Sequence, residues 1–140
     1  MTHPIYPCLW FDGQAKEAAD FYCSIFKKSR ITTENPMVVM FELNDSTFMA
    51  LNGGPHFTFN EATSFVVNCD TQEEIDYYWD KLTEGGEESM CGWLKDKYGL
   101  SWQIVPSILG KLVSDPEKGQ RVVQAFLKMK KFDIQTLLNA

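Results

Sequence analysis

The hydrophobic and polar positions of this chain follow two periods, and these periods recur in the same order in each half. Alternating apolar and polar residues are typical of strands, whereas an apolar residue at every third or fourth position is typical of a helix. Strands are predicted at residues 5–11, 37–43, 47–54, 63–69, 90–96 and 99–106, and helices at 15–28 and 70–86. Asp70 or Thr71 is expected to cap the second helix and Gly85 to end it.

Two stretches of the second half repeat the apolar register of the first half. A shift of 56 residues places FYCSIF at 21–26 on YYWDKL at 77–82. A shift of 54 residues places FMAL at 48–51 on WQIV at 102–105. Few residues are identical between the two halves, so the prediction depends on the shared order of strands and helices. The pattern predicts a duplicated unit of one strand, one helix and further strands.

A helical tail follows the last strand and belongs to neither half. Ser114 or Asp115 is suited to cap a helix that has Pro116 in its first turn. A second short helix is expected at about 132–138. Two interpretations stay open, because the tail can pack on the sheet or form a contact between two copies of the chain.

The composition is that of a globular domain with an acidic surface. Of the 140 residues, 44% are hydrophobic and 23% are charged, and the formal net charge is −6 at pH 7. A negative field opposes the binding of a polyanion, and the cationic cluster KMKK at 128–131 suits the end of a helix. No 18 apolar residues follow one another. We therefore expect neither nucleic acid nor a membrane as a partner.

The cysteines and the N-terminal stretch are those expected of a cytoplasmic protein. The four cysteines are Cys8, Cys23, Cys69 and Cys91, and their spacing is not that of a metal site. The start, MTHPIYPCLWFDG, has no cationic leader, and its apolar run is short for a signal peptide. Reduced thiols in a cytoplasmic protein are therefore expected.

The strand YGLSWQIVP at 98–106 has a glutamine at its centre. Leu100, Trp102 and Ile104 fall on one face, and Gln103 falls on the other face. One face of an antiparallel strand is often solvated, so Gln103 can be a surface residue. The other interpretation is that Gln103 points into a ligand cavity.

Three stretches of the chain resemble a known family. They are LWFDGQAKEAADFYCSIF at 9–26, FMALNGGPHFTFNEATSFVVNCDTQEEIDYYWDKL at 48–82, and CGWLKDKYGLSWQIVP at 91–106. Together they resemble the PhnB-like branch of the vicinal-oxygen-chelate superfamily, often catalogued as demethylubiquinone methyltransferase-like, beside glyoxalases and bleomycin-resistance proteins. The resemblance implies an α+β fold in which paired βαβββ modules form a curled mixed sheet, a cup around a small-molecule cavity, usually in a homodimer.

The resemblance also implies boundaries for the parts of the chain. We expect a single domain at 1–140, with module one at about 4–54, module two at about 60–106, and a helical tail at about 114–139. The stretch RITTENPMVVMF at 30–41 is short where relatives commonly carry a longer, glycine-rich loop. A lid over the cavity is therefore expected to be reduced.

Metal-using members of the superfamily take one ligand from each of four strands. The resemblance places these positions, within about one residue, at Tyr6, Met49, Ala62 and Gln103. One step along the chain brings Cys8 or Ser64 nearby. Divalent transition metals require imidazole, carboxylate or thiolate ligands, and the neutral amide of Gln103 does not hold such an ion alone. We expect no family-type metal and no cofactor.

Other catalytic chemistry has little support in the sequence. His3 and His56, the two histidines, lie in the N-terminal stretch and in the linker between modules. A GxSxG motif is missing, and so is the GxGxxG turn that a methyltransferase of the common class would need. Cys8 can be a reactive thiol in the cup or an inert small side chain. Whether the protein is an enzyme stays open.

The candidate pocket combines apolar walls with a few polar groups. Its expected residues are Tyr6, Cys8, Trp10, Met49, Ser101 and Gln103, with Phe59 and Trp93 near the rim. These side chains can equally fill the cup as core. We predict a protein that binds a small, partly apolar molecule of unknown identity. The alternatives are a metal-dependent lyase, isomerase or dioxygenase, or a methyltransferase-like enzyme as the family label suggests.

Overall fold

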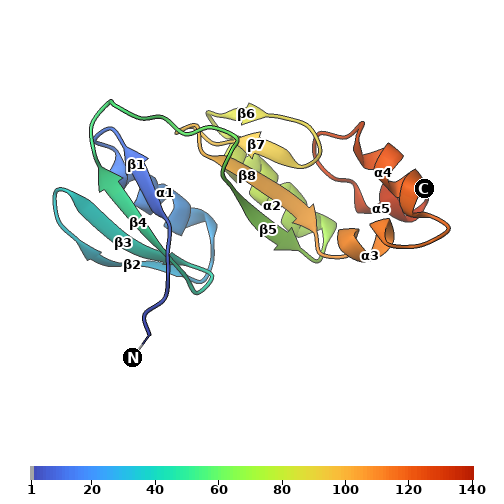
Figure 1. The fold of residues 1–140 in the computed structure, drawn as a ribbon, viewed down its shortest axis with the longest axis horizontal. Helices are drawn as coiled ribbons and strands as arrows, with labels where there is room; N and C mark the ends of the chain where they lie inside the picture. Colours follow the sequence, from blue (N-terminus) through green and yellow to red (C-terminus); the bar gives the residue numbers. More distant parts are fainter. Residues whose placement is uncertain (1) are drawn as a thin grey trace. The chain divides into compact units, whose positions relative to one another are not determined.

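A computed structural model describes residues 2–140, which form two compact units that meet in sequence between Phe59 and Asn60 (Figure 1). Each unit contains one four-stranded mixed sheet. The strand order is β1-β4-β3-β2 in the first unit and β5-β8-β7-β6 in the second. The two orders agree position for position, so the α+β class and the paired βαβββ modules are confirmed. The expected curled sheet corresponds here to two open four-stranded sheets, one in each unit.

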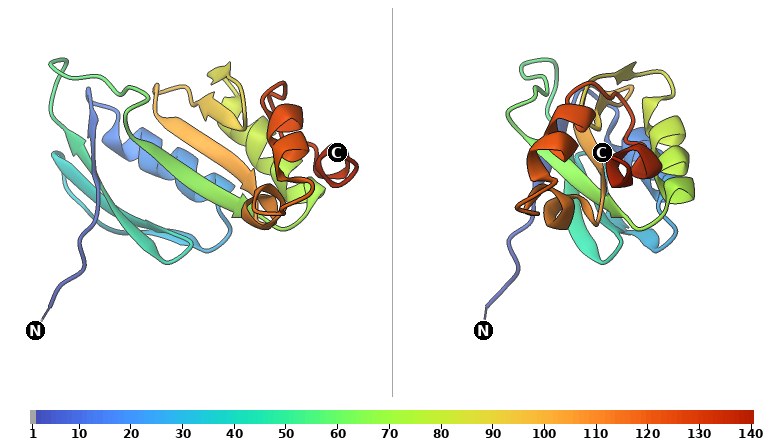
Figure 2. Two further views of the ribbon diagram at one scale, coloured as in Figure 1. Left: turned by 45° about the vertical axis from the view of Figure 1, so that its right-hand side comes forward. Right: turned by 90° about the vertical axis from the view of Figure 1, so that its right-hand side faces the viewer.

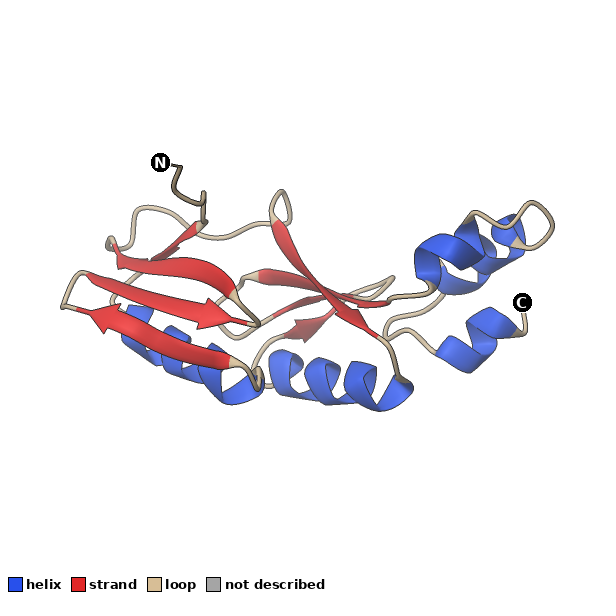
Figure 3. Cartoon of the chain, turned by 90° about the horizontal axis from the view of Figure 1, so that it is seen from below, coloured by secondary structure: helices blue, strands red, loops and turns tan. Residues whose placement is uncertain are grey.

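The first unit contains one helix and four strands: β1 (Cys8–Phe11), α1 (Ala15–Ile25), β2 (Ser29–Glu34), β3 (Val38–Leu43) and β4 (Ser46–Asn52). β1 runs parallel to β4, and the other two pairings are antiparallel. Helix α1 covers one face of the sheet (Figure 3). The core between them includes the stacked rings of Tyr22, Phe41 and Phe48, with centroid separations of 6.2 and 5.4 Å. Ala15, Ala18 and Ala19 allow α1 to approach the sheet closely, and all three are fully buried.

Strand β1 begins later than its apolar pattern predicts. Ile5 is fully exposed at 101%, and the predicted start of this strand at residue 5 is wrong. Pro4 and Pro7 flank Ile5, and a proline has no N–H to donate to a neighbouring strand. Pairing with β4 therefore starts at the carbonyl of Pro7, which accepts from Met49 N at 3.0 Å.

A hairpin of β2 and β3 occupies the stretch that was expected to form a reduced lid. At its tip, Asn35 Oδ1 accepts from the backbone N–H groups of Met37 and Val38, each at 2.9 Å. The next turn, between β3 and β4, places Asn44 and Asp45 at φ values of 49° and 71°. Two left-handed residues of this kind match the twist of a two-residue hairpin, and Asn and Asp tolerate them.

The second unit repeats the strand and helix order and then adds three short helices. Its elements are β5 (Ser64–Cys69), α2 (Gln72–Thr83), β6 (Glu87–Glu88), β7 (Trp93–Lys95), β8 (Ser101–Pro106), α3 (Leu109–Val113), α4 (Gly119–Phe126) and α5 (Ile134–Leu138). Thr71 caps α2, because its Oγ1 accepts from Glu74 N at 3.2 Å. No helix of residues 2–140 has the length and apolar content needed to cross a membrane.

The helical tail begins with a capped turn rather than directly with a helix. Asp115 Oδ1 accepts from Glu117 N at 2.8 Å and from Lys118 N at 3.0 Å, and α4 starts at the next residue, Gly119. Figure 2 shows α3, α4 and α5 gathered at one end of the second unit.

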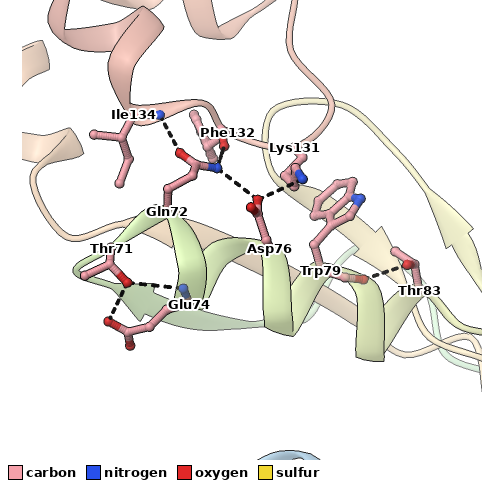
Figure 4. Close-up of polar contacts among 9 residues, drawn as sticks. All are labelled: Thr71, Gln72, Glu74, Asp76, Trp79, Thr83, Lys131, Phe132 and Ile134. Atoms are coloured by element: carbon pink, nitrogen blue, oxygen red, sulfur yellow. Dashed lines mark hydrogen bonds and ion pairs between the residues drawn. The ribbon is translucent and has the colours of Figure 1, made fainter.

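The tail is fastened to the second unit by one glutamine and one buried ring. Gln72 Nε2 donates to the Phe132 carbonyl at 2.9 Å, and Gln72 Oε1 accepts from Ile134 N at 2.8 Å (Figure 4). The Phe132 ring is buried against Gly92, where an added Cβ would lie 2.4 Å from a ring carbon. The tail therefore packs on its own unit, which is one of the two interpretations left open by the sequence.

Candidate functional site

The face of the first sheet that α1 does not cover is largely apolar. Cys8 pairs with Met49, and Met49 pairs with Met40, so these three side chains form a row across β1, β4 and β3. Trp10 pairs with Leu51 in the next row of the same face. Three expected pocket residues, Cys8, Trp10 and Met49, therefore share one face. Tyr6 precedes β1 and is 39% exposed.

The loop after β4 fixes the indole of Trp10. The indole Nε1 of Trp10 donates to the Gly54 carbonyl at 2.8 Å, and Phe57 lies edge-on to the indole ring at 4.9 Å between centroids. Gly53 lies against the ring, because an added Cβ would come within 2.3 Å of the indole. Phe59, expected near the rim, packs edge-on against the buried Phe11 ring at 5.4 Å.

The second sheet offers a more polar face opposite its helix. Trp102 and Ile104 of β8 are buried on the α2 side, so Ser101 and Gln103 lie on the other side. The half-buried Gln103 donates from Nε2 to Ser64 Oγ at 2.9 Å. Its Oε1 accepts no hydrogen bond from residues 2–140 and stays available to a ligand.

The four family-type metal positions lie on both units, two on each. Tyr6 and Met49 belong to the first unit, and the exposed Ala62 and Gln103 belong to the second. Tyrosine ionises near pH 10, methionine is a weak ligand and alanine has no donor atom. Within residues 2–140, no three His, Cys, Asp or Glu side chains gather in a way that could hold a metal ion. The donor set at these positions does not fit a divalent metal.

A pocket of about 260 Å³ lies in the second unit, beside β6, β7 and β8. The lining residues that matter for its chemistry are Glu61, Glu87, Trp93, Lys95 and Ser101. Two of them, Ser101 and Trp93, were expected from the sequence near the ligand. The Lys95 ammonium forms an ion pair with Glu61, which raises the pKa of Lys95 and lowers the pKa of Glu61.

Sequence reasoning missed the charged residues of this pocket. Lys95 lies two positions from Trp93 and opposite Ser101, so strand alternation alone could have placed it on the same face. Glu87 and Glu88 form a two-residue strand without an apolar residue, and its sequence carries no strand signal.

The thiols and histidines show little sign of activation. Burial raises the pKa of Cys69 to about 12, and partial burial also raises the pKa of the exposed Cys8. Both groups therefore stay protonated near neutral pH, and the thiolate is the nucleophilic form. His3 and His56 are exposed at the surface. The geometry offers enclosure and hydrogen bonding rather than an activated nucleophile.

Comparison with known proteins shows which family and which solved structures this chain resembles. The sequence profile of the 3-demethylubiquinone-9 3-methyltransferase family matches residues 3–105. A Bacillus cereus structure described as a putative 3-demethylubiquinone-9 3-methyltransferase, PhnB protein, is 35% identical with a TM-score of 0.69, over 75% of this chain and 100% of that chain. No curated protein matches this chain.

Two more distant structures show the same fold. A glyoxalase-related enzyme from Fulvimarina pelagi is 12% identical with a TM-score of 0.56, over 78% of this chain and 91% of that chain. A glyoxalase/bleomycin resistance protein from Albidiferax ferrireducens is 13% identical with a TM-score of 0.54, over 72% of this chain and 95% of that chain.

Proposed function

Because this chain belongs to the PhnB-like 3-demethylubiquinone-9 3-methyltransferase family, with the fold of glyoxalases and bleomycin-resistance proteins, we propose that it binds a small, partly apolar molecule without a family-type metal. The observation that carries the proposal is the identity of the side chains at the four inherited ligand positions. Met49 and Gln103 provide contact area and a hydrogen bond there, and neither is a strong metal ligand.

Each unit has an open sheet face that offers its own kind of contact to a small molecule. The row of Cys8, Met49 and Met40 gives a soft apolar surface that adapts to a flat molecule. Gln103 gives a directed polar contact, because Ser64 fixes its amide while the amide oxygen stays available. Few polar groups in an apolar surface are typical of small-molecule sites.

The proposed setting is a homodimer in the cytoplasm. β1 and β5 are edge strands within their own units, and an edge strand presents unpaired backbone groups to a second chain. The dimer is tested by light scattering after gel filtration, where a mass of one chain would contradict it. Free cysteines and a formal charge of −6 agree with a reducing compartment and with a small molecule rather than a nucleic acid as partner.

The binding experiment uses 1-naphthol as a neutral, flat probe and thermal unfolding as the readout. A true binder raises the free energy of unfolding by RT ln(1 + [L]/Kd), about 2.7 kcal/mol at a hundredfold excess over Kd. Met49→Gln is expected to abolish the shift, because it places an amide in the apolar row. Met37→Gln is the matched control, since Met37 is 62% exposed and lies outside the strands.

Metal analysis of protein purified without chelators separates this proposal from a metal-dependent enzyme of the glyoxalase type. We expect no stoichiometric divalent ion and no effect of a chelator on probe binding. An ion bound in a one-to-one ratio, lost together with probe binding in Gln103→Ala, would favour the enzyme.

A further inference from the structure

Three side chains lie in one row across the pocket of the second unit. Glu87 of β6 pairs with Lys95 of β7, and Lys95 pairs with Ser101 of β8. The neighbours Leu94 and Trp102 are buried on the α2 side, so the row lies on the other face of the sheet. The pocket is therefore walled by side chains whose positions are fixed by strand register.

Ser101 is the one group in this row whose polar atom is buried without a partner. The residue is 0% exposed, and its Oγ has no hydrogen-bond partner within residues 2–140. A buried hydroxyl without a partner destabilises a fold, so its presence calls for an explanation. Because Ser101 lines the pocket, a donor on a bound molecule would satisfy this oxygen.

The charges around Ser101 determine which donor suits the pocket. Two carboxylates, Glu61 and Glu87, lie on this side with one ammonium, Lys95, which leaves a formal charge of −1, whereas Glu88 pairs with Leu94 and lies on the α2 side of the sheet. Lys95 is already paired with Glu61, whereas Glu87 forms no ion pair within the described chain. This field favours a cation over a neutral or anionic molecule.

Trp93 and the volume of the pocket indicate which kind of cation it can bind. Trp93 adds an indole, whose face attracts organic ammonium ions. No metal-binding group of His, Cys, Asp and Glu side chains occurs within residues 2–140. The volume of about 260 Å³ is below the roughly 300–1,000 Å³ of sites for drug-sized molecules. The pocket therefore suits a small headgroup or a short amine.

We propose that this pocket binds the ammonium group of a small amine, with Ser101 Oγ accepting a hydrogen bond from it and Glu87 neutralising its charge. The inference goes beyond the proposed function, because it assigns a ligand class to a second pocket. The amine pocket uses side chains other than the apolar row of the first unit. Amine binding and the proposed function can therefore be tested separately.

The test is a titration with n-butylamine, protonated at pH 7, followed by amide and indole NMR signals of the intact protein. We expect saturable shifts at Ser101 and Trp93 that weaken as salt is added. The neutral analogue 1-butanol and the anionic butyrate, at the same concentrations, should leave these signals unchanged.

Two variants and one control assign the contacts. Ser101→Ala should weaken amine binding about tenfold because it removes the acceptor, while the fold becomes no less stable. Glu87→Gln should weaken binding about fivefold and remove most of its salt dependence. Glu73→Gln is the control, since Glu73 is an exposed carboxylate of α2 outside the pocket.

Each result decides the proposal. Shifts that do not saturate, an equal response to 1-butanol, or unchanged affinity in the variants would overturn it. Met49→Gln should remove 1-naphthol binding and leave amine binding intact, whereas Glu87→Gln should do the reverse. Loss of 1-naphthol binding alone would count against the proposed function only.

Discussion

Trp102 donates from its indole Nε1 to the carboxylate oxygen Oδ2 of Asp96 at 2.9 Å, and both residues are buried. The other oxygen of Asp96 accepts from Tyr98 N at 2.9 Å and from Leu100 N at 3.1 Å. Gly99, with a φ of 86°, allows the tight turn between β7 and β8. One carboxylate therefore closes the turn and joins it to the core. These contacts give the stretch KDKYGLSW a structural role that does not depend on ligand binding.

Asp96→Asn tests this arrangement. An amide offers one acceptor in place of two, so either the Trp102 indole or the turn backbone loses its partner and meets an N–H group instead. We expect the free energy of unfolding to fall by about 1–3 kcal/mol, measured by urea denaturation. Asp12→Asn, at an exposed position, should change it by less than about 0.5 kcal/mol. Equal stability of the Asp96 variant and the native protein would show that the turn does not depend on this carboxylate.

The main elements were predictable because their signals are local. Trp102 and Ile104 alternate with Ser101 and Gln103, and the structure places the first pair on the buried face of β8. The capping of α2 by Thr71 follows from the side chain itself.

The missed features depend on partners distant in sequence or on very short segments. β2 is almost entirely exposed, so it lacks the alternation that identifies a half-buried strand. The position of Glu87 beside Lys95 follows from strand register, which the two glutamates alone do not encode. The expected pocket residues Tyr6, Cys8, Trp10, Met49, Ser101 and Gln103 divide between the two units, and their joint pocket stays a prediction.

Gln72 is expected to control how firmly the tail is held. Gln72→Glu keeps the acceptor for Ile134 N, but it loses the donor to the Phe132 carbonyl and places a carboxylate beside Asp76. We expect faster hydrogen exchange at the Ile134 amide and a loss of about 1–2 kcal/mol in unfolding free energy. Gln124→Ala, on the exposed side of α4, serves as the control. Exchange at Ile134 that is unchanged in Gln72→Glu would assign the anchoring to Phe132 alone.

The thiols should differ strongly in reactivity. At pH 8 an aromatic disulfide reagent is expected to react first with the exposed Cys8, more slowly than with free cysteine because partial burial raises the pKa of Cys8. Cys69 should react only after unfolding, since its side chain is 1% exposed and its pKa is raised to about 12. Cys8→Ser should remove the first kinetic phase; a phase that persists in this variant would assign it to Cys23 or Cys91.

The ion pair between Lys131 and Asp76 joins the tail to α2 at 2.8 Å (Figure 4). Hydrogen bonding to Lys131 lowers the pKa of Asp76 from its ordinary 3.8, so the stabilisation is present above pH 3.8 and is lost as pH falls through the lower folded value. Hydrogen bonding to Asp76 raises the pKa of Lys131 above 10.5, so the contribution is present below pH 10.5 and is lost as pH rises further.

Asp76→Asn isolates the charge, because an asparagine oxygen can still accept from Gln72 Nε2. We expect the variant to be less stable by about 0.2–1 kcal/mol between about pH 5 and pH 9, since both side chains are partly exposed. The difference should disappear as pH falls from 3.8 through the lowered pKa of Asp76, and it should shrink in 1 M salt. Lys131→Gln should lower the stability by a similar amount over the same pH range. The effects of the two changes should be non-additive in a double-mutant cycle. A stability difference that persists at pH 2 would assign the effect of Asp76 to packing rather than to its charge.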